Sequence, residues 1–234
     1  MTQLRYPNIC EGKFIRRINR FLAEVLIDGR KTMCHVKNTG RLKELLTDGA
    51  VVYLEKSSDP MRKTGYSLIS VKKGSRIVNI DSQAPNKVFC EGLVEGKIKL
   101  PGFDQVSCIK QESTYGTSRF DFYIENGSRK AYVEVKGVTL ETEGIAKFPD
   151  APTQRGVKHI YELTDAKKSG FDAYIVFIIQ MNNIKYFTPN DATHREFGEA
   201  LRFAAENGVG VIALECDVWP DCIELNGKEC AVLL

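Results

Sequence analysis

Apolar and polar positions alternate along much of the first eighty residues, as is typical of half-buried strands. The segment FIRRINRFLAEVLIDGRKTMCHVKN predicts two strands around Asp28-Gly29, a dipeptide that favours a two-residue hairpin turn. A short helix is expected at 41–46, and AVVYLEKS and GYSLISVKK predict two further strands. With a separate strand at 14–18, three strands precede the helix and two follow it. That order is found in the OB-fold, a small Greek-key barrel that often binds oligonucleotides.

After about residue 82 the pattern changes to helices that separate apolar strands. Helices are expected at 85–95, with Ser82 available as N-cap and Pro85 at the start, at 153–168, and at 191–206. The segments QVSCIKQES, FDAYIVFIIQM and VGVIALECDV predict strands, and the second is apolar throughout, like a buried strand of a mixed or parallel sheet. We therefore expect an α/β (α+β) protein with an OB-fold-like β-barrel at 1–82 and an α/β domain with a mixed central sheet at 83–234.

The stretch RFDFYIENGSRKAYVEVKG, residues 119–137, predicts a second hairpin, because Asn-Gly favours a tight turn. If Asn126 and Gly127 form the loop, Asp121 lies opposite Tyr132. Side chains repeat every two residues along a strand, so one face would hold Asp121, Tyr123, Lys130, Tyr132, Glu134 and Lys136. The other face would hold an apolar core surface of Phe120, Phe122, Ile124, Ala131, Val133 and Val135.

Two carboxylates and a lysine on one face of this hairpin indicate candidate chemistry. Diagonal neighbours lie about 7–8 Å apart at Cα, so the oxygens of Asp121 and Glu134 can converge on one hard cation. Without a cation the two carboxylates repel each other, and one is expected to have a raised pKa. A solvated face of mixed charge is the alternative interpretation. A register slip of one residue would also move Asp121 to the opposite face.

The segment GVTLETEGIAKFPDAP, which follows Lys136, is expected to be a long irregular loop. Loops of this length inside a compact domain are usually functional or mobile. Its Glu141, Glu143 and Lys147 could move over a site, and solvated loop charge is the alternative.

Charge is divided unevenly along the chain. Residues 1–81 contain 16 Lys+Arg and 8 Asp+Glu, a balance of +8, whereas the remaining 17 basic and 22 acidic residues give −5. A basic first part beside a mildly acidic second part favours a polyanion-binding module next to a cation-binding one. Tyr53, Tyr66 and Phe21 could stack on bases. Charges that are merely solvated are the alternative for each single residue.

Several classes of protein find no support. No apolar run of about 18 residues predicts a membrane span, and the segment MTQLRYPNIC does not resemble a signal peptide, so a cytoplasmic protein is expected. Seven scattered cysteines argue against a disulfide framework, and no Cys-x-x-Cys pair supports a zinc site. The sequence has neither the Gly-x-Ser-x-Gly elbow of hydrolases nor a Walker-type phosphate loop.

Several separated stretches resemble a known family. They are APNKVFCEGLVEGKI, ESTYGTSRFDF, YVEVKGVTL, FPDAPTQRGVKHIYEL, FLAEVLIDG and CHVKNTGRLKELL. A hairpin with Asp and then Glu-x-Lys between helices resembles the core of the PD-(D/E)XK nuclease superfamily, and nearly the whole chain resembles the sugar fermentation stimulation protein A family. This resemblance implies an OB-fold, a restriction-endonuclease-like domain and DNA binding without sequence specificity. The family is named for a regulatory effect on sugar, notably maltose, metabolism.

The resemblance also implies roles for individual residues. Asp121 and Glu134 correspond to the acids that bind Mg²⁺ or Mn²⁺, and Lys136 corresponds to the lysine that orients or activates the attacking water. Val135 would offer its backbone carbonyl to the cation, and Glu91 matches the acid that the first helix often supplies. The sequence departs from the superfamily pattern at Phe120, which stands where a proline precedes the first aspartate.

Candidate nucleic-acid contacts come from the basic first part and from the helix after the hairpin, where the resemblance implies phosphate contacts. They are Arg16, Arg17, Arg20, Lys37, Arg41, Arg155 and His159. The expected activity is metal-dependent hydrolysis of DNA. A non-catalytic DNA-binding regulator is the main alternative, because a fold and a motif do not establish activity. A binder of single-stranded RNA is a third hypothesis, because OB-folds serve both polymers.

Overall fold

The computed structural model describes residues 3–234, and the first part of the chain forms a closed β-barrel. Its five strands are β2 (Ile9–Arg17), β3 (Leu22–Ile27), β4 (Arg30–Val36), β5 (Val51–Lys56) and β6 (Tyr66–Lys73). Antiparallel pairing joins them in the order β4-β3-β2-β5-β6, and a parallel pairing of β4 with β6 closes the ring. The short strand β7 (Arg76–Asn79) extends from β6. The OB-fold-like barrel predicted from the sequence is confirmed.

Two local features of the barrel differ in how well they were predicted. The Asp28-Gly29 turn forms as expected, with positive φ angles of 48° and 75°. The helix expected at 41–46 is wrong, because that segment makes only one turn, in which the amides of Leu45 and Leu46 donate to the carbonyl of Leu42. Leu42 has a positive φ of 49°, which a helix does not allow, and its buried side chain joins the core. The strand expected at 14–18 is the second half of β2.

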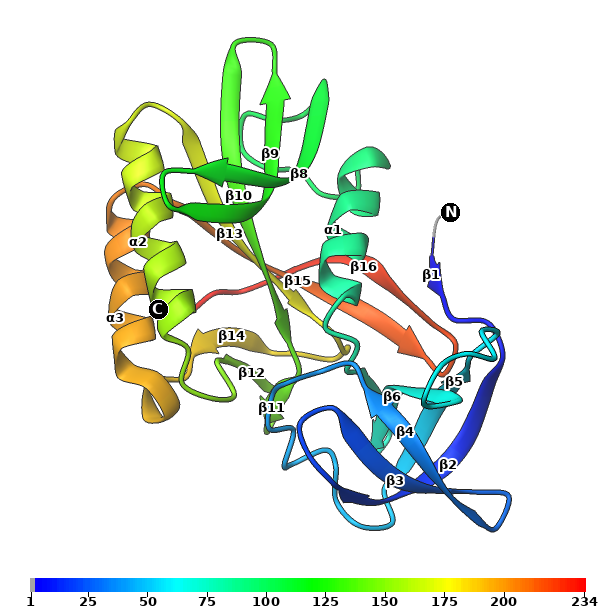
Figure 1. The fold of residues 1–234 in the computed structure, drawn as a ribbon. Coiled ribbons are helices and arrows are strands. Elements are labelled where there is room, and N and C mark those ends of the chain that lie inside the picture. Colours follow the sequence, from blue (N-terminus) through cyan, green and yellow to red (C-terminus); the bar gives the residue numbers. More distant parts are fainter. Residues whose placement is uncertain (1–2) are drawn as a thin grey trace.

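The second part of the chain is built on a seven-stranded mixed sheet (Figure 1). The strand order is β1-β16-β15-β13-β10-β9-β8, with β10, β13 and β15 parallel and the other pairs antiparallel. The strands are β1 (Leu4–Arg5), β8 (Cys108–Tyr115), β9 (Ser118–Asn126), β10 (Arg129–Val138), β13 (Asp172–Ile179), β15 (Gly210–Trp219) and β16 (Cys222–Cys230). The expected mixed central sheet is therefore confirmed, although β1 and β16 were not predicted.

Three helices cover the two faces of this sheet. Helix α1 (Ala84–Val94) lies on one face, and α2 (Gln154–Lys168) and α3 (Asp191–Glu206) lie on the other (Figure 1). Their bounds are close to the predicted ones. Ser82 does not cap α1, since its hydroxyl donates to the carbonyl of Lys37 instead. No helix within residues 3–234 is both long and apolar enough to cross a membrane.

The segment expected to be an irregular loop after Lys136 is mostly ordered strand. β11 (Leu140–Thr142) and β12 (Ile145–Phe148) form a hairpin, and β14 (Tyr186–Pro189) pairs in parallel with β12. The hairpin turns at Glu143 and Gly144, whose φ angles are 56° and 84°. Strands of three and four residues are too short to show alternation, so their pattern resembled a loop.

Candidate metal and nucleic-acid site

The hairpin that carries the two acids has a register shifted from the predicted one. Asn126 pairs with Arg129, so the turn is formed by Gly127 and Ser128, not by Asn126 and Gly127. Tyr123 therefore lies opposite Tyr132, and the prediction that Asp121 faces Tyr132 is wrong. Continuing the register would set Asp121 opposite Glu134, but the ladder between β9 and β10 ends at Phe122 and Val133.

Where the two strands separate, the alternation of faces in β9 breaks. The ring of Phe122 packs on Phe89 of α1, with centroids 4.9 Å apart. Phe120 instead packs on Tyr132 and on His159 of α2, at 5.5 and 6.0 Å. The predicted face that holds Phe120 together with Phe122 is therefore wrong, and Asp121 lies at the break.

Asp121 occupies the gap left by the separating strands. Its Oδ2 accepts a hydrogen bond from the amide of Val135 at 2.8 Å, a donor that has no partner in β9 at this level of the sheet. Its Oδ1 accepts a hydrogen bond from Asn86 of α1 at 2.9 Å. Burial, and then the charge of Glu134, raise the pKa of the Asp121 carboxyl, in agreement with the expectation that one acid of the pair titrates high.

Glu134 has two oxygens in different environments, and the residue is only 3 % exposed. Its Oε1 accepts hydrogen bonds from the ammonium of Lys136 and from Nδ1 of His159, the latter at 2.6 Å. Its Oε2 is buried and has no hydrogen-bond partner among the described residues. Burial raises the pKa of Glu134, but the charge of Lys136 and the hydrogen bonds from His159 and Lys136 outweigh it, so the pKa lies below its ordinary value.

Helix α2 brings His159 and Arg155 to the site. Thr153 caps the helix by accepting a hydrogen bond from the amide of Gly156 at 3.1 Å. His159 is buried, 5 % exposed, so it does not present a surface contact for nucleic acid. Arg155, one turn earlier, is exposed, and its Nε donates to Nε2 of His159 at 3.3 Å. The structure thus joins Arg155, His159, Glu134 and Lys136 in one chain of contacts.

Two of the expected metal ligands, Glu91 and Val135, do not lie with a side-chain oxygen next to Asp121 and Glu134. Glu91 lines a hollow with Glu95, Lys97 and Glu224, away from the acidic pair. It lies five residues after Asn86, which is about 140° around the helix. Burial and the charge of Glu95 raise its pKa. Asn86 is the α1 residue that contacts Asp121, and Val135 does so through its amide. A metal contact through the carbonyl of Val135 stays a prediction.

The predicted nucleic-acid residues of the barrel fall into two groups. Arg17 donates five hydrogen bonds to the backbone carbonyls of Asn19, Arg20, Asn38, Gly40 and Arg41. Lys37 pairs with Glu55 and Asp81, each at 3.4 Å. Both side chains are therefore committed to internal contacts and have a structural role.

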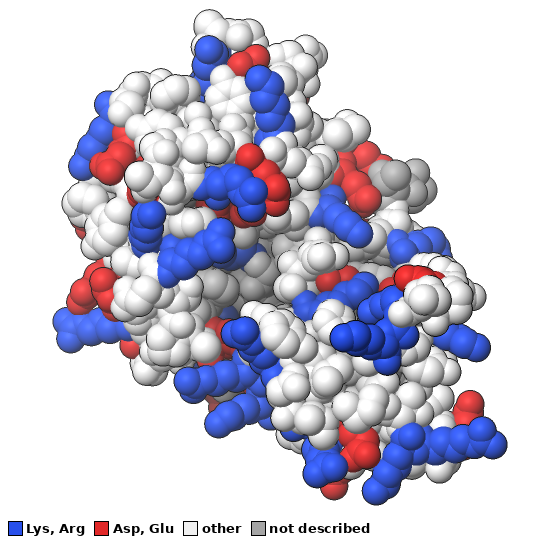
Figure 2. Space-filling view, viewed as in Figure 1, with Lys and Arg blue, Asp and Glu red and all other residues white. Residues whose placement is uncertain are grey.

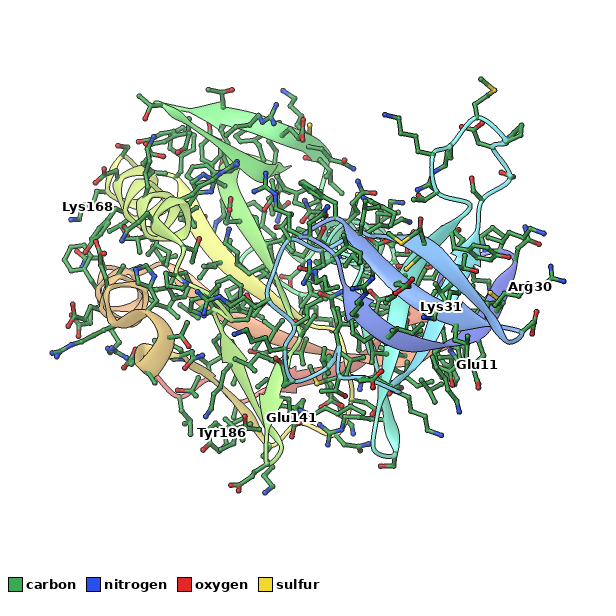
Figure 3. All side chains as sticks on the ribbon, turned by 60° about the horizontal axis from the view of Figure 1, so that its bottom comes forward. Glu11, Arg30, Lys31, Glu141, Lys168 and Tyr186 are labelled. Carbon is green, nitrogen blue, oxygen red and sulfur yellow. The ribbon has the colours of Figure 1, made fainter. Side chains whose placement is uncertain are left out.

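The other three predicted barrel residues, Arg16, Arg20 and Arg41, face solvent. Arg16 is exposed and pairs with Glu24 at 3.0 Å, and Arg20 stacks on the exposed ring of Phe21, 4.7 Å from its centroid. Arg41 is exposed and lines a hollow of about 420 Å³ together with Arg16, Arg17 and Lys43. Arg30 and Lys31 lie elsewhere, at the outer end of the β3–β4 hairpin, and do not line this hollow (Figure 3). Arg20 and Arg41 remain the barrel residues best suited to contact phosphate.

A cavity of about 360 Å³ lies between the barrel and the second domain. Asn38, Thr39 and Gly40 line it from the barrel, and Gly137, the residue after Lys136, lines it from β10. Figure 2 shows a hollow between the two parts of the molecule, with Lys and Arg side chains on both sides. The lining reaches β10 at Gly137, one residue from Lys136, and includes neither Lys136 itself nor the two acids.

The donor set fits a hard divalent cation that keeps several waters. Mg²⁺ is usually bound through one or two carboxylates together with substrate phosphates, rather than by an all-protein cage. Asp121 and Glu134 supply two carboxylates, and the unpartnered Oε2 of Glu134 is a buried oxygen that such a cation could satisfy. Within residues 3–234 no cluster of three or more His, Cys, Asp or Glu side chains is arranged as a metal cage.

Sequence analysis did not identify Asn86, and it gave His159 a different role. A single Asn in the first turn of a helix carries no signal of its own. The spacing of Arg155 and His159, four residues apart, indicated that they share a helix face. That spacing could not show that this face is turned toward Glu134, since the path of the chain between β10 and α2 was not predicted.

Comparison with known proteins agrees with this architecture. The model of the SfsA N-terminal OB domain matches residues 15–80, and the model of the sugar fermentation stimulation protein RE domain matches residues 83–222. A curated sugar fermentation stimulation protein homolog from Desulfitobacterium hafniense (strain Y51) is 57 % identical, over 94 % of this chain and 95 % of the relative. Another, from Clostridium beijerinckii, is 53 % identical, over 95 % of this chain and 97 % of the relative.

A solved structure, that of Pyrococcus furiosus SfsA in complex with Ca²⁺, covers 100 % of both chains with a TM-score of 0.90 at 31 % identity. The likeness therefore includes the barrel, the mixed sheet and their arrangement. The two domain models together match most of the residues of this chain. On these similarities, the chain belongs to the sugar fermentation stimulation protein (SfsA) family.

Proposed function

We propose that this protein binds DNA without sequence specificity and hydrolyses its phosphodiester bonds with Mg²⁺ or Mn²⁺. The observation that carries the proposal is the buried, unpartnered Oε2 of Glu134 next to a second, half-buried carboxylate, that of Asp121. Five other buried side-chain atoms of the described residues also lack a partner, so what supports the proposal is the place of this oxygen beside Asp121 and Lys136, where a bound cation would satisfy it. The Ca²⁺ complex of the Pyrococcus furiosus relative supports divalent-metal binding by the same fold.

Asp121 and Glu134 would hold the cation, each kept in place by its hydrogen bonds. A divalent cation supplies positive charge that offsets the charge developing on the phosphate oxygens during hydrolysis. Lys136, a compact ammonium beside Glu134, would donate a hydrogen bond to the attacking water or to a phosphate oxygen. Arg155 and Arg41 are exposed and would bind flanking phosphates.

Digestion of labelled single- and double-stranded DNA by the wild-type protein, with Mg²⁺, Mn²⁺ or EDTA, tests the proposal. Asp121→Ala is expected to abolish metal-dependent cleavage and to leave the affinity for DNA in EDTA largely unchanged. Asp104→Ala, which removes an exposed carboxylate outside the site, is the matched control and should cleave like the wild type. Cleavage by Asp121→Ala at the wild-type rate would refute the assignment of the site.

The non-catalytic regulator is distinguished by the same experiment. In that case neither protein would release nucleotides with any metal, while both would bind DNA with an affinity that falls steeply as salt increases. Binding that does not respond to salt would count against DNA as the partner. Equal binding of RNA and DNA strands without cleavage would favour the single-strand binder.

A further inference from the structure

The two carboxylates of the site are held by helices on opposite faces of the sheet. Asn86 of α1 and the amide of Val135 occupy both oxygens of Asp121, at 2.9 and 2.8 Å. On the other face, His159 of α2 binds Glu134 at 2.6 Å, and both of these residues are at least nine-tenths buried. A contact this short between buried groups fixes the orientation of a side chain far better than a surface ion pair does.

Only one oxygen of Glu134 is used in this way. Lys136 and His159 both donate to Oε1, and Oε2 has no partner in the part of the chain that the structure describes. The carboxylate is therefore turned so that one oxygen serves the protein and the other is left for a ligand. If the hydrogen bond from His159 were lost, rotation of the carboxylate would allow Lys136 to compete for either oxygen.

The second contact of His159 determines which tautomer the neutral ring adopts. The guanidinium of Arg155 is always protonated and can only donate, so Nε2 of His159 must accept its hydrogen bond at 3.3 Å. In the neutral ring the proton is then on Nδ1, which is the atom that donates to Glu134. Because both nitrogens are engaged, His159 is poorly placed to take a proton from water or to touch phosphate.

We propose that His159 is a positioning residue, which holds Glu134 so that Oε2 points to a divalent cation, and that Arg155 fixes the tautomer needed for this. The inference deepens the proposed function and rests on it. Residues that hydrogen-bond a metal ligand without touching the metal typically change the affinity for that metal by about 10–100-fold when they are replaced. His159 thus belongs to the metal site and not to the nucleic-acid surface.

Two substitutions separate positioning from packing. In His159→Asn the amide nitrogen takes the place of Nδ1 and can still donate to Glu134, whereas in His159→Gln it takes the place of Nε2. The affinity for Ca²⁺ is measured by isothermal titration calorimetry on the full-length protein, together with thermal melting in EDTA. We expect Asn to keep the affinity within about threefold of the wild type and Gln to lower it by about 10–100-fold.

Melting in EDTA reports the loss of packing, which should be greater for the shorter Asn than for Gln. A purely structural role would make the Ca²⁺ affinity follow the melting temperature, with Asn as the weaker binder, and would overturn the proposal. Equal Ca²⁺ affinities in all three proteins would also overturn it and leave the proposed function intact. No Ca²⁺ binding by the wild type, with Mg²⁺ and Mn²⁺ also failing, would overturn both.

Discussion

Lys73 on β6 of the barrel donates to both the carboxylate and the backbone carbonyl of Glu141 on β11, at 2.7 and 2.6 Å. Glu141 is buried where the second domain meets the barrel (Figure 3), and Arg76 lies 3.4 Å from its other carboxylate oxygen. The amide of Gly144 also donates to this carboxylate. These contacts join β11 to the barrel beside the cavity, so Glu141 helps to set the relative position of the two domains. The expectation that Glu141 could move over a site is therefore replaced by a structural role at the junction of the two domains.

The first prediction concerns this junction. Burial raises the pKa of Glu141, but the hydrogen bonds from Lys73 and Gly144 outweigh it and hold the pKa below the ordinary 4.5. An acid whose folded pKa is depressed contributes stability above its unfolded pKa and loses it as the pH falls through the folded value. Glu141→Gln should therefore lower the free energy of unfolding by about 1–3 kcal/mol at pH 7.

Urea unfolding at several pH values checks this prediction. The difference between wild type and Glu141→Gln should be constant above about pH 5.5 and should shrink as the pH falls below 4.5. Glu143→Gln, in the same hairpin but exposed, is the control and should unfold like the wild type. A difference that grows toward acid would contradict the assignment.

The two acids of the site should respond oppositely to neutralisation in the absence of metal. Burial and the charge of Glu134 raise the pKa of Asp121, so its ionisation destabilises the folded state as the pH rises above 3.8. Asp121→Asn should then raise the melting temperature at pH 7.5 in EDTA. The pKa of Glu134 is depressed, because Lys136 and His159 bind its charged form. Glu134→Gln loses that charge and should therefore lower the melting temperature.

Differential scanning calorimetry in EDTA measures both shifts. For a chain of this length each kcal/mol corresponds to about 2–4 °C. Excess Ca²⁺ should raise the melting temperature of the wild type above that of Asp121→Asn, because only the wild type keeps both carboxylates and gains stability from binding. Destabilisation by both substitutions in EDTA would indicate that Asp121 is not penalised by its burial.

A third prediction separates the two kinds of basic residue in the barrel. Arg17→Lys keeps the charge but cannot bridge five carbonyls, so the free energy of unfolding should fall by about 1–3 kcal/mol. Arg41→Ala, which removes an exposed side chain, should leave unfolding within about 0.5 kcal/mol of the wild type.

DNA binding should show the reverse order for these variants. Each phosphate contact contributes about 0.9 to the slope of log affinity against log salt, so Arg41→Ala should weaken binding and flatten the slope by roughly that amount. Fluorescence anisotropy at several salt concentrations provides the measurement. An unchanged slope for Arg41→Ala would show that Arg41 does not contact DNA. A slope changed by Arg17→Lys alone would show that Arg17, and not Arg41, makes the phosphate contact.

The fourth prediction concerns the hydrogen bond that Asn86 of α1 donates to Asp121. Asn86→Leu removes the donor to Oδ1 and leaves this half-buried carboxylate oxygen without its partner. The Ca²⁺ affinity should fall by about tenfold, as for other residues that orient a metal ligand. Lys87→Gln, the exposed neighbour on the same helix, is the control. Calorimetric titration of both variants decides whether Asn86 belongs to the site.

The strands and helices with long, regular patterns could be predicted from the sequence. The barrel strands, the apolar run of β13 and the three helices of the second domain all appear close to their expected bounds. The segment 41–46 forms a turn and not the predicted helix, and the side chains of Leu42 and Leu45 are buried in the core. Local propensity does not contain that tertiary contact.

The three residues predicted to form the site come together, but their geometry differs from the predicted one. Asp121, Glu134 and Lys136 are close in the structure, yet Asp121 reaches the pair from a break in the strand and not from a shared face. Asn-Gly indicated the turn, but the strand extends one residue further, through Asn126. Asn86 and His159 come from helices whose packing on the sheet depends on the whole fold, which no single stretch of sequence encodes.

The pairing of β1 with β16 has a consequence for the order in which the molecule can be completed during its synthesis. Leu4 and Arg5 are synthesised more than two hundred residues before their partners Ile223 and Cys222. The barrel can close while translation continues, because all of its strands lie before residue 74. The large sheet must wait, because β1 and β15 both keep an unpaired edge until β16, which lies between them, has been synthesised.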